Sequence, residues 1–194
     1  MKLVALCGAA GAGKDTVADM LPARKLAFAD ALYREVAEAW GVDQHVLRCR
    51  ETKELEAPNL SVAHCKDMEF RTNCWRDFHN LPRSPRQILQ WWGDYRRTQD
   101  PDYFVRRAEH EINIRWHLGE DTVLTDVRFP NEAALVRQLG GQLWQIRRPG
   151  YEAGGTGHAS DTAGDEFRPG VVLENFGSLD DLRRTALDAW GYRG

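Results

Sequence analysis

The chain has 194 residues, 42% of them hydrophobic, and no Pro/Ser-rich stretch divides it, so we expect one domain over residues 1–194. Its formal net charge of -3 argues against a general nucleic-acid or membrane-surface binder, because such proteins usually carry a basic excess. The apolar run near residue 1 is interrupted by Gly8 and is too short for a signal peptide or membrane span. We therefore expect a cytoplasmic protein.

The first forty residues contain two units in which an apolar strand precedes a helix. We expect strands over 2–7 and 25–28 and helices over 15–21 and 30–40. Pro22 should end the first helix, while Asp30 is expected to cap the second and Gly41 to end it.

The middle of the chain contains an irregular segment followed by one well-marked helix. Residues 43–82 are polar and irregular, and no period in them predicts a structure. A helix is predicted from Ser84, because Ser84, Pro85 and Gln87 supply an N-cap, a proline at the first helical position and a capping-box partner. We expect Gly93 to end it.

The second half of the chain returns to alternating strands and helices. We expect strands over 122–127, 142–148 and 171–175, and helices over 101–118, 133–139 and 178–190. Residues 149–169 are rich in glycine and lack periodicity, which is typical of a mobile loop. The alternation predicts an α/β fold, with a parallel sheet covered by helices on both faces.

A glycine-rich segment between the first strand and the first helix has the spacing of a phosphate-binding Walker A loop. It runs from Gly8 to Thr16, and the residues we expect to contact a nucleotide are Gly11, Ala12, Gly13, Lys14, Asp15 and Thr16. Backbone N–H groups of such a loop surround a phosphate, and the ammonium of Lys14 reaches the β and γ phosphates. Asp15 stands where Ser or Thr normally binds Mg²⁺, so we expect it to hold the metal through water.

Two charged residues follow the strand predicted at 122–127. Asp126 is a candidate for the second metal-binding carboxylate of a P-loop protein, although a turn or capping role is an alternative. Arg128 is expected at the carboxyl end of the sheet, where ligands of open α/β sheets bind. We assign it a catalytic role and contact with the acceptor.

Further polar and cationic residues lie on the predicted helix at 84–93 and at the end of the strand at 142–148. Arg86 and Gln90 share a polar helix face and are candidate acceptor ligands, with a solvated surface as the alternative. Arg148 adjoins the predicted loop, from which it can move onto the transferred phosphoryl group as the loop closes.

The chain resembles the phage-type deoxynucleoside monophosphate kinases of the P-loop kinase superfamily. The segments that carry the resemblance are GAAGAGKDT at 8–16, FADAL at 28–32, SPRQILQWWG at 84–93, TDVRFPNEAALVRQLGG at 125–141, IRRPG at 146–150 and ENFGSLDDL at 174–182. The resemblance implies a P-loop NTPase fold with a five-stranded sheet, an acceptor-binding insertion at 43–100 and a lid loop at 148–168, as in nucleoside monophosphate kinases. It also implies that Asn175 and Gly177 contact adenine and that Asp30 lies near the acceptor.

These observations predict an enzyme that transfers the γ-phosphoryl group of ATP, with Mg²⁺, to a deoxynucleoside monophosphate (dNMP). The alternatives are a kinase for another phosphorylated acceptor such as dephospho-coenzyme A, and a nucleotide-binding regulatory or packaging ATPase. We expect a small-molecule substrate, no nucleic-acid partner and no membrane, and leave a homodimer open. The sequence does not indicate which base is accepted.

Overall fold

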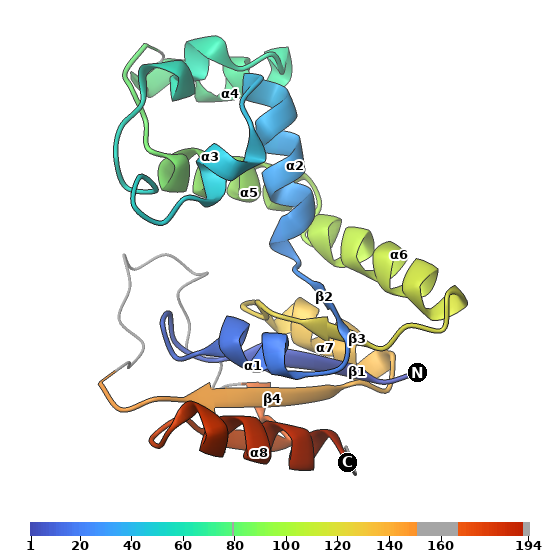
Figure 1. The fold of residues 1–194 in the computed structure, drawn as a ribbon. Helices are drawn as coiled ribbons and strands as arrows, with labels where there is room; N and C mark the ends of the chain where they lie inside the picture. Colours follow the sequence, from blue (N-terminus) through green and yellow to red (C-terminus); the bar gives the residue numbers. More distant parts are fainter. Residues whose placement is uncertain (79, 151–166, 192–194) are drawn as a thin grey trace. The chain divides into compact units, whose positions relative to one another are not determined.

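The computed structural model describes residues 1–78, 80–150 and 167–191, shown in Figure 1. The chain forms two compact units, one of Met1–Phe28 with Val105–Gly194 and one of Ala29–Phe104. Most of the lid loop predicted at 148–168 lies outside the described residues.

The first unit contains a parallel sheet of five strands, which confirms the predicted α/β architecture. Its strands are β1 (Leu3–Cys7), β2 (Arg24–Leu26), β3 (Thr122–Leu124), β4 (Gln142–Arg147) and β5 (Val171–Glu174). They lie in the order β2-β3-β1-β4-β5, and every pairing is parallel. The strand predicted over 122–127 ends at Leu124, so Asp126 lies beyond it.

Helices cover both faces of this sheet because β1 is apolar on both of its sides. Leu3, Ala5 and Cys7 pack with residues of α6 (Tyr103–His117) and α7 (Pro130–Gln138). Val4 and Leu6 pack on the other face with α1 (Lys14–Met20) and α8 (Leu179–Trp190), which also contact each other (Figure 1). A strand buried on both faces is typical of a parallel sheet.

The second unit is helical. It contains α2 (Ala29–Trp40), α3 (Gln44–Arg48), α4 (Met68–Phe78), α5 (Pro85–Gln99) and two short 3₁₀ helices at Pro58–Leu60 and Val62–His64. The rings of Trp40, Phe70 and Trp92 pack at its centre with centroids 5.0–5.7 Å apart. Residues 43–82, for which the sequence predicted no structure, therefore supply part of an aromatic core.

A carboxylate joins α2 and α5 of this unit and also binds Tyr103. Glu35 on α2 accepts hydrogen bonds from the indole N–H of Trp92 at 2.9 Å and from Nε of Arg96 at 3.2 Å. Its other oxygen accepts from the hydroxyl of Tyr103 at 2.7 Å, at the start of α6. Hydrogen bonds to a partly buried charge are among the stronger polar contacts, so Glu35 fixes the spacing of α2 and α5.

Two predicted helix boundaries are wrong. α2 begins at Ala29, which places Asp30 inside the first turn rather than at the cap. Gly93 does not end its helix, because α5 continues to Gln99. A Cβ at Gly93 would lie 2.8 Å from Nη1 of Arg97, the end of a flexible side chain, and 3.8 Å from Leu32, an ordinary contact distance, so packing does not require a glycine here.

The predicted capping box of Ser84 and Gln87 is confirmed, and Ser178 and Asp181 form a second one. Cys7, Cys49, Cys65 and Cys74 form no disulfide with one another in the described part of the chain. Throughout the described residues, no helix combines the length and the apolar character that crossing a membrane requires.

Candidate active site

The turn between β1 and α1 needs glycine at its first position. Gly8 has a φ of 133°, and a Cβ there would lie 2.4 Å from the carbonyl oxygen of Ile146 on β4. Only glycine tolerates both the left-handed backbone and so close a neighbour. The loop therefore begins tightly against the adjacent strand, at the carboxyl end of the sheet.

Asn175, directly after β5, holds the other end of this loop. Its side-chain amide donates to the carbonyl oxygen of Ala12 at 2.9 Å, and its backbone N–H donates to Arg147 at 2.7 Å. Gly13 has a φ of 106°, and a Cβ there would lie 2.7 Å from the Asn175 amide nitrogen. In this structure Asn175, predicted to contact adenine, supports the loop.

Lys14 folds back over the loop. Its ammonium donates to the carbonyl oxygens of Gly8 at 2.8 Å and Ala9 at 2.9 Å. Burial, followed by the positive charge of Arg128, lowers the pKa of Lys14, while Asp15 and Asp126 oppose this shift. A partly desolvated ammonium beside a tight glycine loop is suited to binding an anion.

Asp126 lies two residues beyond β3 and is 9% exposed. Its Oδ1 accepts a 2.7 Å hydrogen bond from the backbone N–H of Phe28, which follows β2. The side chain therefore joins the ends of two neighbouring strands, and its charge acts on Lys14. The predicted role of Asp126 as a metal-binding carboxylate stays a prediction, while the hydrogen bond to Phe28 gives it a structural role as well.

Arg128 is exposed, and its backbone is fixed by a residue that the sequence analysis missed. The buried carboxylate of Glu132 accepts from the N–H groups of Arg128 at 2.7 Å and Phe129 at 3.1 Å. Glu132 stands three residues after the cap Phe129, which is the spacing of a capping box. That spacing was the available signal, although Phe129 lacks the usual polar side chain.

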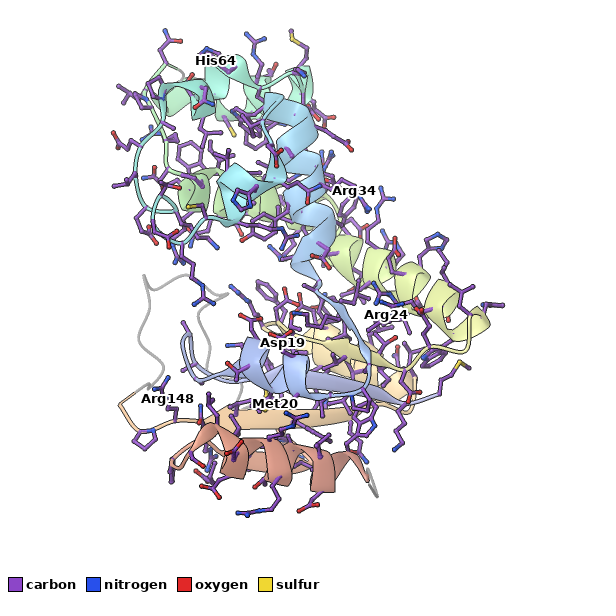
Figure 2. All side chains as sticks on the ribbon, in the orientation of Figure 1. Asp19, Met20, Arg24, Arg34, His64 and Arg148 are labelled. Carbon is purple, nitrogen blue, oxygen red and sulfur yellow. The ribbon has the colours of Figure 1, made fainter. Side chains whose placement is uncertain are left out.

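The remaining predicted nucleotide ligands lie around the same loop. Arg148, labelled in Figure 2, is exposed and approaches the carbonyl oxygen of Gly11 at 3.4 Å. Asp15 is exposed and Thr16 half-buried in the first turn of α1. Gly177 directly precedes the Ser178 cap of α8. The charges of Asp126 and Arg128 both act on Lys14, so these three residues interact electrostatically within the first unit.

The predicted acceptor ligands are divided between the units. Arg128 belongs to the first, whereas Asp30, Arg86 and Gln90 belong to Ala29–Phe104. Asp30 pairs with Arg48 at 2.8 Å, and Arg86 pairs with Glu54. Gln90 is half-buried on α5.

The carboxylates of the site fit a magnesium ion bound mainly by phosphate and water. Within the described residues, no group of three or more His, Cys, Asp or Glu side chains is arranged to hold a metal. Mg²⁺ does not need such a group, because it usually binds one or two carboxylates together with substrate phosphates. Asp126 and Asp15 supply oxygen ligands of this kind.

Comparisons with known proteins give two viral relatives. No family model matches the chain. It is 38% identical over 86 residues to "Uncharacterized protein ORF77" of Ictalurid herpesvirus 1, a match that spans 43% of this chain and only 38% of the relative. It is also similar to the "Putative deoxynucleotide monophosphate kinase" of Acanthamoeba polyphaga mimivirus, at 29% identity over 200 residues, 94% of this chain and 92% of that protein.

Proposed function

We propose that the protein is a deoxynucleoside monophosphate kinase that transfers the γ-phosphoryl group of ATP to a dNMP, yielding ADP and a deoxynucleoside diphosphate. The observation that carries the proposal is the position of Lys14, whose ammonium lies on the loop carbonyls and interacts with Asp126 and Arg128. The near full-length similarity to a viral protein named as such a kinase supports the choice of acceptor.

The donor triphosphate binds in the loop of residues 8–16. Its β and γ phosphates replace the Gly8 and Ala9 carbonyls as partners of Lys14, and backbone N–H groups of Gly11 to Thr16 contact the remaining oxygens. The triphosphate charge offsets the desolvation that lowers the pKa of Lys14, so binding favours the charged ammonium.

Arg128 and Arg148 act on the transferred group. A guanidinium forms two parallel hydrogen bonds to phosphate oxygens and stabilises the charge that builds up during transfer. Glu132 holds the Arg128 backbone, so the point from which this side chain extends is fixed before substrate binds. Asp30, Arg86, Gln90 and Arg128 bind the acceptor.

Asp126 and Asp15 would hold Mg²⁺, Asp15 through water. When bound, the ion would neutralise part of the charge on the transferred phosphoryl group.

An acceptor panel tests the proposal. ADP release by the purified protein is measured with Mg²⁺ and ATP in the presence of dAMP, dGMP, dCMP, dTMP, modified dCMP analogues or dephospho-coenzyme A. We expect turnover with at least one dNMP and none with Lys14→Met. Turnover with dephospho-coenzyme A alone, or hydrolysis of ATP that no acceptor stimulates, would instead indicate one of the two alternative functions.

A further inference from the structure

Two cationic side chains converge on one tyrosine ring in the second unit. The guanidinium carbon of Arg48 lies 4.0 Å from the ring centroid of Tyr33, and the ammonium of Lys53 lies 5.5 Å from it. Lys53 also donates to the Tyr33 hydroxyl at 2.8 Å. Both cations come from residues 43–82, which the resemblance places in the acceptor-binding insertion at 43–100 but for which the sequence predicted no structure.

These residues connect two side chains that the sequence analysis assigned to the acceptor. Arg48 donates to Oδ1 of Asp30 at 2.8 Å, and Asp30 lies on the same helix as Tyr33. At the other end, the backbone N–H of Arg86 donates to the carbonyl oxygen of Lys53 at 3.0 Å. Asp30, Arg48, Tyr33, Lys53 and Arg86 therefore form one continuous series of contacts, which we call the Tyr33 cluster.

The cluster is oriented yet accessible. The side chains of Arg48 and Asp30 are each 42% exposed. Among the described residues, the guanidinium of Arg48 hydrogen-bonds a single carboxylate oxygen, so donors remain for a second anion. Stacking on Tyr33 limits the rotamers of Arg48, which reduces the entropy lost when it binds a ligand.

We propose that Arg48 and Lys53 bind the phosphate group of the acceptor nucleotide, with Tyr33 and Asp30 holding Arg48 in position. This inference rests on the proposed kinase function, and it adds residues that no motif identified. A phosphate dianion suits the pair, because the planar fork of Arg48 offers two parallel donors and Lys53 adds a second positive charge.

The test compares steady-state kinetics of full-length variants with the dNMP that gives the highest turnover. Arg48→Met and Lys53→Met should each raise the KM for the dNMP roughly 10- to 100-fold, since each loses a charge-assisted contact. The KM for ATP and the melting temperature should stay close to wild type. Arg48→Lys should give an intermediate KM, because it keeps the charge and loses the fork.

Arg24→Met is the matched control. Arg24 also belongs to an exposed ion pair, with Glu120 at 3.1 Å, but lies in the other unit and is labelled in Figure 2. Its KM for the dNMP should not change. A wild-type KM for both Arg48→Met and Lys53→Met would overturn the inference, as would an equal rise in the KM for ATP.

A binding measurement separates this inference from the kinase proposal. If the wild-type protein phosphorylates no dNMP, the proposed function fails, and the cluster is then judged by calorimetric titration with inorganic phosphate. Weaker phosphate binding by Arg48→Met than by Arg24→Met supports the anion site. Equal binding by the two variants, or no binding by the wild-type protein, rejects it.

Discussion

Replacing Gly13 by alanine tests how Asn175 supports the loop of residues 8–16. Gly13 has a φ of 106°, which alanine adopts only with strain, and the added Cβ would lie 2.7 Å from the amide nitrogen of Asn175. The Asn175 side chain would have to leave its position. Its 2.9 Å hydrogen bond to the buried residue Ala12 would then be lost.

Two contributions set the size of the effect. The left-handed backbone costs alanine about 1–3 kcal/mol. Displacing Asn175 removes one hydrogen bond, which is worth about 0.5–1.5 kcal/mol. Gly13→Ala should therefore lower the free energy of unfolding by about 2–4 kcal/mol, and lower the melting temperature by about 4–16 °C for a chain of this size.

A double-mutant cycle with Asn175→Ala separates the two contributions. Urea unfolding followed by circular dichroism gives the free energy for the wild type, both single variants and the double variant. In the Asn175→Ala background the cost of Gly13→Ala should fall by about 0.5–1.5 kcal/mol, because no side chain remains to be displaced. Additivity within about 0.3 kcal/mol would refute the link between Gly13 and Asn175.

Three further predictions concern charges and thiols. Burial lowers the pKa of Lys14 in the folded protein. At pH values below this lowered pKa the buried ammonium is charged and destabilises the fold. The destabilisation is relieved as the pH rises through the lowered pKa toward the higher pKa of the unfolded chain. Lys14→Met removes the charge that is proposed to bind the phosphates, so it should abolish ATP-dependent transfer. Because it also removes the burial cost of that charge, it should not lower the urea midpoint, and a lower midpoint would contradict this reasoning. Asp126→Asn keeps an oxygen for the Phe28 N–H, so the free energy of unfolding should change by less than about 1 kcal/mol. The kcat at saturating Mg²⁺ should nevertheless fall at least about 100-fold, because the negative charge is lost. An unchanged kcat would exclude the proposed role in transfer. Burial raises the pKa of the Cys65 thiol to about 11. Iodoacetamide at pH 8 should therefore label the half-buried Cys49 before the buried Cys65, as measured by peptide mass spectrometry. Equal labelling of the two cysteines would argue against the burial of Cys65.

The sequence predicted the sheet well because local signals and tertiary packing agree there. The apolar runs at 2–7, 142–148 and 171–175 became β1, β4 and β5. Prediction failed at Gly93, which lies inside α5 because the tertiary packing of that helix outweighs the cost of about 1 kcal/mol of a glycine in a helix interior. It also failed at 43–82, whose short helices are held by an aromatic core assembled from distant segments.

The sequence identified several residues of the candidate site, but it did not predict most of the contacts that hold them in place. Spacing alone identified Lys14, Asp126 and Arg128, which interact in the structure. The support from Glu132 was missed because its cap partner is the apolar Phe129. Asn175 was assigned to adenine by resemblance, and only the three-dimensional arrangement relates it to Ala12.

The bond between Asn175 and Ala12 has a consequence for synthesis of the protein. On the ribosome, β1 emerges long before β3 and β4, the strands that flank it, and its loop lacks support until residue 175 has left the exit tunnel. If the proposed function holds, nascent chains stalled before that point should therefore bind nucleotide poorly, even though residues 8–16 have already been translated.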